Sequence, residues 1–496
     1  MSQPRLQIAR RLFLSALGLI FLIAFASLLV QLRGLIGTDG ILPAGEFLSW
    51  ARARLGSGAW IQVPTLFWVE AGDVFLEGTC VAGMLLSALL MVGFGPRWTL
   101  LALWFLYLSF ESVGGVFLSY QWDILLLEAA VMGLFVAPSR LAPSRAWASP
   151  VWPGGIWLVR WLLFRLMVLS GLVKLLSGDE TWRRLTALRF HYWTQPLPNP
   201  ISFFAAHLPN AAQTFSAALM FVVELLVPWM IFVNARTRLW AAAILIGFQL
   251  SILLTGNYGF FNLLAIALCF VLLDDEQWSR LLPKPLGRRI VQSALPPTKP
   301  VAWIRGTRIG IAALLVLLSF GEMRFWRRRL PGPIEDLLAA LEPFRSINSY
   351  GLFAVMTTAR PEILVEGSRD GQDWRTYEFK WKPGPVDEIP KWVAPHQPRL
   401  DWQMWFAALG SCRHNPWFLR FQKRLLEGSP AVLSLLKGNP FPAAPPKYVR
   451  SVVYRYQPAE IAEWRGDGHA WKRELEGSYC PSLALEDGNL VAPSMP

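Results

Sequence analysis

Three ionisable side chains lie inside segments that are otherwise apolar, namely Glu128, Lys174 and Glu224. A charge in such surroundings is costly unless it is paired, so it marks either an internal ion pair or a functional site. One interpretation is structural, with Glu128 paired to Arg160 or Arg165 and Lys174 extended toward the membrane interface. The other makes Lys174 a general base, because burial lowers the pKa of a lysine.

His191, four residues before Gln195, is a second candidate for chemistry. Histidine titrates near neutral pH, so it can bind a ligand or move a proton. The proline-rich run 195–200 is also explained simply as a rigid, specifically packed loop. Lys174 and His191 are therefore predicted catalytic residues only if the protein is a membrane enzyme.

His396, Arg399 and Asp401 form a polar set directly before Trp402 and Trp405. On a helix starting near residue 400, the two tryptophans are three residues apart and share one face. Three interpretations stay open for this set. It forms an internal Arg399–Asp401 pair with tryptophans in the core, it docks at the membrane surface, or it contacts a partner protein. The third makes these five residues partner-binding.

The sequence lacks the motifs of several enzyme classes. It has no Gly-x-Ser-x-Gly nucleophile elbow, no phosphate-binding loop and no dinucleotide glycine pattern. No Cys-x-x-Cys or cysteine and histidine set has zinc spacing. We therefore predict no metal and no cofactor, and a non-enzymatic role is favoured.

The elements that must position these residues follow from composition. The chain is 54% hydrophobic and only 16% charged, against about 25% charged in typical globular domains. Long apolar runs occupy 1–320, whereas 321–496 reads as water-soluble, so we predict a multi-span transmembrane domain and a C-terminal soluble domain. A spanning helix needs about 20 mostly apolar residues. Roughly nine segments qualify: 12–31, 75–94, 98–116, 122–138, 156–177, 212–233, 238–255, 259–273 and 304–320.

The orientation follows from basic residues near the first span. Arg5, Arg10 and Arg11 place the N-terminus in the cytoplasm. An odd number of spans then puts the C-terminal domain outside the cytoplasm, and an error of one span reverses this. The net charge of +13 is scattered between apolar segments, which argues against a nucleic-acid partner.

The C-terminal part predicts an α+β domain. Residues 350–357, 362–366, 377–382 and 447–457 read as strands, and Asp370-Gly371 is a hairpin turn signal. Segments 400–409, 417–426 and 431–437 read as short helices. We expect a β-sandwich-like sheet with a helical insertion. Cys412 and Cys480 can form a disulfide if this domain faces an oxidising compartment, although spacing alone does not establish the pair.

Four segments carry a family resemblance. Val393-Ala-Pro-His-Gln-Pro-Arg-Leu-Asp-Trp-Gln-Met-Trp-Phe-Ala-Ala-Leu409 resembles the signature of the lipase maturation factor family, membrane proteins that help secreted lipases reach an active fold. Segments 348–358, 360–368 and 191–200 also resemble that family, and the resemblance extends from about Gly37 to Tyr456.

A more distant resemblance concerns the membrane domain. Ser170-Gly-Leu-Val-Lys-Leu175, followed by Asp179 and Trp182, is similar to a run in the vitamin K-dependent γ-carboxylase superfamily, and Thr38-Asp-Gly-Ile-Leu-Pro43 resembles a loop of it. In the carboxylase a lysine of this run is the base that activates the cofactor, and Lys174 matches that position.

The first resemblance implies a membrane-bound maturation factor or chaperone. Its partners would be a secreted lipase or another exported client protein, together with the lipid bilayer. The alternative is a membrane enzyme with a carboxylase-like core and Lys174 as base. A redox factor using Cys412 and Cys480 and a transporter using Glu128 and Glu224 are further alternatives, and the lack of Cys-x-x-Cys argues against the former. The missing Asn-x-Ser/Thr sites favour a bacterial inner membrane over the endoplasmic reticulum.

Overall fold

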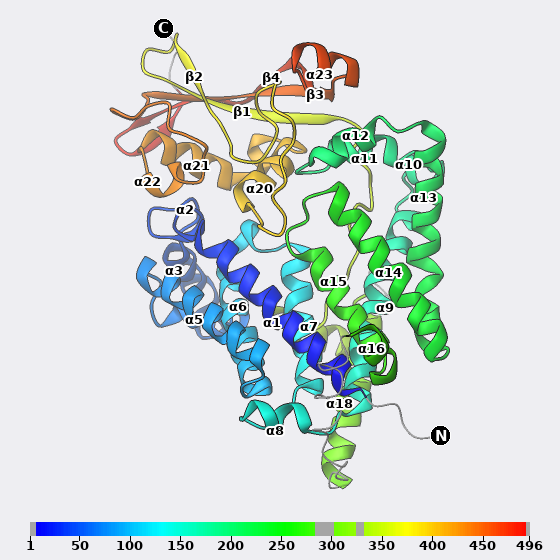
Figure 1. Ribbon diagram of the computed structural model, residues 1–496. Helices are drawn as coiled ribbons and strands as arrows, with labels where there is room; N and C mark the ends of the chain where they lie inside the picture. Colours follow the sequence, from blue (N-terminus) through cyan, green and yellow to red (C-terminus); the bar gives the residue numbers. More distant parts are fainter. Residues whose placement is uncertain (1–5, 283–301, 324–331, 493–496) are drawn as a thin grey trace.

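The computed structural model describes residues 6–282, 302–323 and 332–492. They form a bundle of long helices with a sheet domain on one end, and the first helix starts at the opposite end (Figure 1). Within these residues, seven helices are long and apolar enough to cross a membrane. They are Gln7–Leu29 (α1), Asp73–Val92 (α5), Pro153–Leu176 (α9), Ala235–Thr255 (α14), Ala302–Gly321 (α18) and two helices that a short 3-10 segment extends, Pro96–Gly114 (α6) as far as Phe117 and Asn210–Leu225 (α13) as far as Phe232.

The two other predicted spans are helical but short. Helix α7, Gln121–Val136, has 16 residues, which at 1.5 Å per residue is about 24 Å, less than the roughly 30 Å hydrocarbon core. Helix α15 covers Phe261–Cys269. Helix α7 contacts α1, α6, α9 and α15, which surround it. The polytopic helical class is confirmed, and seven of the nine predicted spans have full length.

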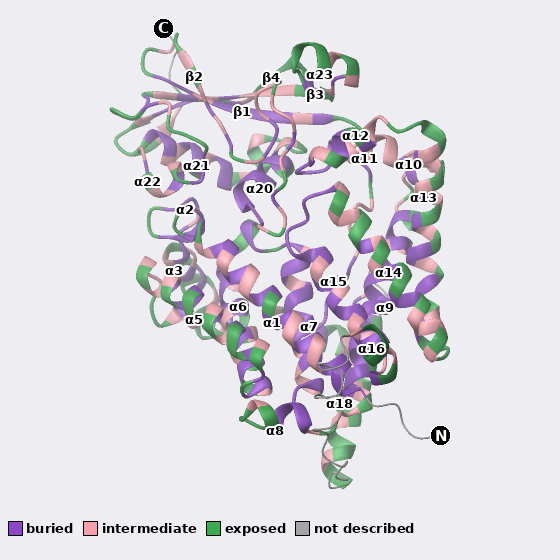
Figure 2. Ribbon diagram, viewed as in Figure 1, coloured by how far each residue is buried: buried purple, intermediate pink, exposed green. Residues whose placement is uncertain are grey.

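The long helices differ in burial (Figure 2). Most residues of α1, α7 and α9 are buried, whereas α5, α13 and α14 carry exposed large apolar side chains on their outer faces. Lipid tails are as apolar as these side chains. The outer faces of α5, α13 and α14 therefore form the surface that the bilayer contacts.

Shorter helices connect the spans. Their bounds are Leu32–Ile36 (α2), Ala44–Leu55 (α3), Ala59–Gln62 (α4), Pro143–Ala148 (α8), Glu180–Arg183 (α10), Leu188–Thr194 (α11), Pro200–Ala206 (α12), Asp275–Leu281 (α16) and Gly332–Leu341 (α19). The proline-rich run 195–200 ends at Pro200, which is the first residue of α12. There Asn199 accepts the backbone N–H of Ser202 at 2.9 Å in a capping box, and Pro200 fills the first turn.

The C-terminal region contains one antiparallel sheet of five strands in the order β2-β1-β3-β4-β5. The strands are Arg360–Ser368 (β1), Trp374–Tyr377 (β2), Tyr448–Pro458 (β3), Trp471–Glu486 (β4) and Asn489–Val491 (β5). Strands β1 and β3 pair along their whole length, from Arg360 opposite Tyr456 to Ser368 opposite Tyr448. The α+β class is confirmed.

Helices take the place that a second sheet would have in a sandwich. Helices Arg399–Ala408 (α20), Pro416–Leu426 (α21) and Pro430–Leu433 (α22) lie between the sheet and the bundle, and α23 (Ile461–Asp467) precedes β4 (Figure 1). Helix α21 buries Phe418, Phe421 and Leu425, which repeat at helical spacing. Residues 350–357, predicted as a strand, form an irregular connector between bundle and sheet instead. The predicted strand 377–382 contributes only Tyr377 to the sheet, at the end of β2.

Candidate functional site

Arg399 joins the sheet domain to the bundle. It opens α20 and is almost completely buried. Its guanidinium donates to the two carboxylate oxygens of Asp123 on α7, at 2.8 and 2.9 Å, and to the carbonyl of Phe117 at 2.6 Å. The hydroxyl of Tyr107 on α6 donates to the same carboxylate. Removing either partner of such a buried pair leaves an uncompensated charge, so each partner requires the other.

The residues before Arg399 bond to the end of the first helix. The hydroxyl of Ser27 accepts the backbone N–H of Gln397 and lies 2.9 Å from Nδ1 of His396. Gln31 donates to the carbonyl of Gln397 at 2.7 Å and accepts the backbone N–H of Arg399 at 2.9 Å. Burial, with the positive charge of Arg399, lowers the pKa of His396 to about 4. The ring is therefore neutral and shares one hydrogen bond with the Ser27 hydroxyl.

The predicted pair between Arg399 and Asp401 does not form. Asp401 accepts the backbone N–H groups of Trp381 and Lys382, at 2.9 and 3.0 Å, and so holds the loop that follows β2. Burial raises the pKa of Asp401 to about 6 despite these bonds. Two residues apart on a helix, Arg399 and Asp401 point to different sides, so they bind different neighbours.

Trp402 and Trp405 face into the molecule. Their side chains are 3% and 6% exposed. Trp402 packs edge-on against Trp122 of α7, with ring centroids 4.7 Å apart, and Trp405 donates to the carbonyl of Thr194 at 2.8 Å. This burial favours packing between domains. Direct partner binding by His396, Arg399, Asp401, Trp402 and Trp405 stays a prediction.

Glu128 of α7 forms a second contact between the bundle and the C-terminal region. It pairs with Arg165 of α9, as the structural interpretation predicted. Its other carboxylate oxygen accepts the backbone N–H of Asn348 at 2.9 Å and the hydroxyl of Tyr350 at 2.6 Å. These contacts explain why residues 350–357 are not a strand, because the side chains that lead into this segment are held by the bundle.

Two further residues hold the domains together and were missed in the sequence. Arg360, the first residue of β1, donates to the carbonyls of Trp193 and Gln195 at 2.8 and 2.6 Å. Asn257, in the loop after α14, donates to the carbonyl of Lys391 and accepts the backbone N–H of Val393. Arg360 also pairs with Glu362, two residues later in β1. The bonds of Arg360 and Asn257 to the backbone of distant segments cannot be predicted from complementary side chains.

Lys174 and His191 line one cavity of about 340 Å³ between α9, α11, α13 and α14. Lys174 does not extend to the interface as predicted, because its ammonium lies 2.8 Å from both carboxylate oxygens of Glu224 and 3.1 Å from the carbonyl of Ser170. Nε2 of His191 lies 3.1 Å from the hydroxyl of Tyr258. The structure thus brings together the two residues of the enzyme interpretation.

Lys174 has an acidic partner and an aromatic neighbour. Glu224 supplies an opposite charge at hydrogen-bonding distance, and the ring of Trp182 lies 5.6 Å from the nitrogen. Burial lowers the pKa of His191 to about 4, together with the charge of Lys174. This arrangement places an ion pair beside a neutral imidazole.

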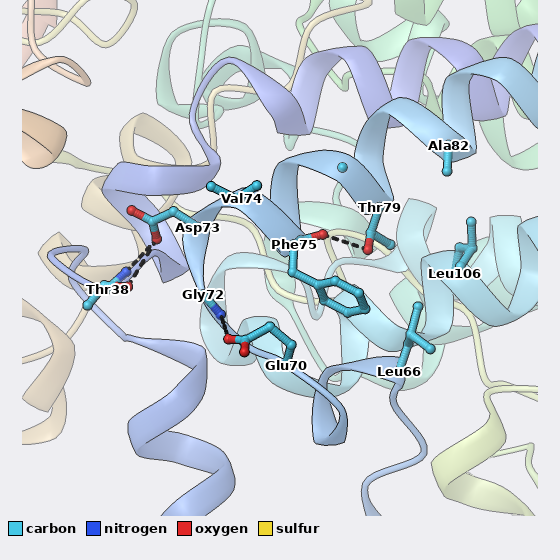
Figure 3. Close-up of a pocket in the computed structure, with 11 residues that line it drawn as sticks. Thr38, Leu66, Glu70, Gly72, Asp73, Val74, Phe75, Thr79, Ala82 and Leu106 are labelled. Atoms are coloured by element: carbon cyan, nitrogen blue, oxygen red, sulfur yellow. Dashed lines mark hydrogen bonds between the residues drawn. The ribbon is translucent and has the colours of Figure 1, made fainter.

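A second hollow lies where α5 begins, next to α6 (Figure 3). Its volume is about 780 Å³. Asp73 accepts the backbone N–H of Thr38 at 2.8 Å, and Glu70 accepts that of Gly72 at 2.7 Å, so both carboxylates cap local backbone. Among the residues that the structure describes, no group of three or more histidine, cysteine or acidic residues could hold a metal ion.

The sheet domain carries a disulfide between Cys412 and Cys480, 68 residues apart. It ties the segment between α20 and α21 to β4. The other two cysteines, Cys80 and Cys269, are free and buried in the bundle. Disulfides persist in oxidising compartments.

Comparisons with known proteins cover nearly the whole chain. Residues 8–280 match the family model of the lipase maturation factor transmembrane domain, and residues 346–481 match that of the lipase maturation factor C-terminal domain. Lipase maturation factor 2 of Xenopus laevis is 35% identical, over 97% of this chain and 83% of its own length. The human protein of that name is 35% identical, over 98% of this chain and 84% of its own.

Lipase maturation factor 1 of Bos taurus is 32% identical, over 97% of this chain and 90% of its own length. No solved structure gives a significant match. The carboxylase-like alternative draws no support from these comparisons.

Proposed function

The chain belongs to the lipase maturation factor family, and from this premise we propose that it is a membrane-bound factor that assists the folding of secreted lipases or related exported proteins. In this proposal residues 1–320 form the membrane domain and 321–496 the extracytoplasmic domain. A folding intermediate exposes apolar surface, and a chaperone that covers it limits aggregation. Release then runs on differences in affinity between the folded and unfolded client.

One observation carries the proposal. Helix α20 lies in the segment with the family signature, and while its tryptophans are buried, Phe406 and Leu409 are each 44% exposed. They are three residues apart and share one face. Because the junction holds α20 on the bundle through Arg399, this apolar face is fixed in orientation. We propose that it contacts the client.

The orientation of the outer domain is part of the proposal. The first helix begins at the end of the bundle that lies away from the sheet (Figure 1). Arg10 and Arg11 lie in the first turns of that helix, which favours a cytoplasmic start, and the disulfide favours an oxidising compartment for the sheet. The outer domain would face the periplasm in a bacterium, or the lumen of the endoplasmic reticulum in a eukaryote.

The test is the specific activity of a co-expressed secreted lipase, per milligram of exported antigen. We expect lower specific activity without this protein, and with Phe406→Ala combined with Leu409→Ala. Leu475→Ala is the matched control, because Leu475 is an exposed leucine on β4 of the same domain. Unchanged activity of several lipases in the absence of the protein would refute the proposal.

The enzyme alternative rests on the cavity shared by Lys174 and His191. Lys174→Arg tests it, because an arginine keeps the charge opposite Glu224 but cannot lose a proton in a protein. Lost activity at normal abundance and stability would favour a base at this position. Retained activity would leave Lys174 with a structural role.

A further inference from the structure

The cavity beside Lys174 opens toward the lipid. Its lining is buried or half-buried except for Leu219 of α13 and Ser251 of α14, which are exposed. Both helices are long and apolar enough to span the membrane, and both run along one side of the bundle (Figure 1). A molecule entering between them therefore comes from the bilayer. The volume of about 340 Å³ lies at the lower end of the usual range for small-molecule sites, roughly 300–1,000 Å³.

The walls of the cavity are apolar and aromatic. They include Leu166, Met220, Phe248, Ile252 and Phe261. The closed side is formed by the connector that leads to the sheet domain, where the ring of Phe353 lies edge-on to His191 with centroids 4.8 Å apart. Phe353 has a φ of +54°, in the left-handed region that side chains other than glycine rarely adopt. The backbone there is held by Trp182, which donates to the carbonyl of Phe353 at 2.9 Å.

The polar groups of the cavity compensate one another in charge. Lys174 and Glu224 form an ion pair, and His191 is neutral because its pKa lies at about 4. A ligand head group with a net charge would therefore add an unpaired charge to a buried site, which is strongly unfavourable. The site is suited to an uncharged head.

The side-chain amide of Gln249 has a hydrogen-bond donor without a strong acceptor. Gln249 accepts from Asn262 at 2.8 Å, but its own amide donates only to the sulfur of Met167 at 3.7 Å, and a thioether is a weak acceptor. Gln249 is 3% exposed and lines the cavity. A buried donor without a good acceptor is costly, and a carbonyl or hydroxyl oxygen of a ligand would satisfy it.

His191 adds a second unused group. The amide of Gln195 donates to two carbonyls, so its oxygen accepts the proton of the Tyr258 hydroxyl at 2.7 Å. A hydroxyl has one proton, so Nε2 of His191 donates to Tyr258 and Nδ1 is the bare acceptor. That Nδ1 is buried and has no hydrogen-bond partner among the described residues. It belongs to a side chain that lines the cavity, so the hydroxyl of a bound ligand would satisfy it.

We propose that this cavity binds a single-chain neutral lipid with a hydroxyl- and ester-bearing head, of the monoacylglycerol class. The chain enters between α13 and α14, and the head lies at Gln249, His191 and the Lys174–Glu224 pair. Binding of this ligand is independent of any client protein.

The experiment is photolabelling of the full-length protein with 1-monooleoylglycerol that carries a diazirine in its acyl chain. We expect saturable labelling of peptides from α9, α13 and α14. Unlabelled monooleoylglycerol should compete about tenfold better than oleate or oleoyl-lysophosphatidic acid, which have the same chain but head groups with a net negative charge. Labelling that does not saturate, or that is equal on the lipid-facing surface of α5, would overturn the proposal.

Two matched variants locate the site. Ser251→Trp places a large side chain at the mouth of the cavity and should reduce the saturable labelling at least about fivefold, which corresponds to roughly 1 kcal/mol. Leu250→Trp places the same side chain on the neighbouring exposed residue, which does not line the cavity, and should leave labelling unchanged. Equal labelling of the two variants, with equal thermal stability, would also overturn the proposal. Competition by oleate as strong as that by monooleoylglycerol would overturn the choice of a neutral head.

Discussion

Arg399 and Asp123 are 276 residues apart in the sequence, and their side chains meet in a double hydrogen bond inside the protein. One belongs to the sheet domain and the other to the helix at the centre of the bundle. Both are almost completely buried. The relationship makes the two domains a single mechanical unit, so the surface of α20 that we assign to the client is held at a fixed place above the membrane.

Loss of this pair should be strongly destabilising. Arg399→Met leaves the carboxylate of Asp123 buried without its partner, and removal of one member of a buried pair costs about 3–5 kcal/mol. Thermal unfolding of the purified protein in detergent measures the change. The double variant Arg399→Met with Asp123→Leu should recover much of the loss, because no charge is then left unpaired.

The matched control is an ion pair at the surface that joins the same two domains. Arg420 of α21 lies 2.6 Å from Glu46 of α3, and both side chains are exposed. Arg420→Met should therefore cost less than about 1 kcal/mol. Equal losses for Arg399→Met and Arg420→Met would show that the Arg399 pair does not hold the domains together.

The disulfide should stabilise the sheet domain. Cys412→Ala with Cys480→Ala is expected to lower the free energy of unfolding of that domain by about 2–5 kcal/mol, since the bond closes a long loop. Protease resistance of the sheet domain at increasing temperature reports the loss. Thiol counting on the denatured wild type gives the direct check: two reactive thiols without reductant and four with it. Four thiols in both conditions, in protein isolated from its membrane, would contradict the pairing.

The orientation predicts a specific labelling pattern. In a background with Cys80→Ala and Cys269→Ala, a cysteine at Ala462 of α23 should react with a membrane-impermeant maleimide added to the outer side. A cysteine at Ser139, in the exposed loop between α7 and α8, should react only after the membrane is permeabilised. The reverse pattern would place the sheet domain in the cytoplasm.

Stability should fall in mild acid. His191 and His396 each have a pKa of about 4 in the folded protein, below the ordinary 6.5, so between these values the unfolded chain binds more protons than the folded one. The free energy of unfolding therefore decreases as pH drops from 6.5 toward 4, by up to about 1.4 kcal/mol per pH unit for each histidine. Asp401 acts in the opposite direction between pH 3.8 and 6, because its folded pKa is raised to about 6.

Unfolding midpoints measured in detergent between pH 7.5 and 5 test this dependence. The decline should be steepest between about pH 5 and 6, where the two histidines of the unfolded chain are largely protonated and together outweigh the opposite contribution of Asp401. His191→Gln with His396→Gln should flatten it, and His414→Gln, on the exposed segment before α21, should leave it intact. An unchanged slope in the double variant would assign the acid sensitivity to other groups.

Local patterns predicted the helices well. All nine apolar segments are helical, and Glu128 pairs with Arg165, one of the two arginines that the sequence offered. Lys174 and Glu224 were both recognised as unusual, but their pairing depends on how α9 and α13 pack, which periodicity does not contain. The signature residues were recognised too, while their partners on α1 and α7 were not.

The failures have a common physical origin. Residues 350–357 have the composition of a strand, yet the contacts of Asn348 and Tyr350 with Glu128 hold that segment on the bundle. Asp401 was assigned to the nearest arginine, whereas it caps the backbone of Trp381 and Lys382. In each case a tertiary contact overrode a local preference.

The hydrogen bonds between the first helix and residues 396–399 can form only late in biosynthesis. Ser27 and Gln31 lie at the end of the first helix, and the residues that bond them are synthesised 366 to 370 positions later. At about 5–20 residues per second, this is a delay of roughly 20–70 s. During it, the carboxylate of Asp123 is inserted without the arginine that neutralises it. A chain that ends before residue 399 therefore carries all the spanning helices but leaves Asp123 without its arginine partner.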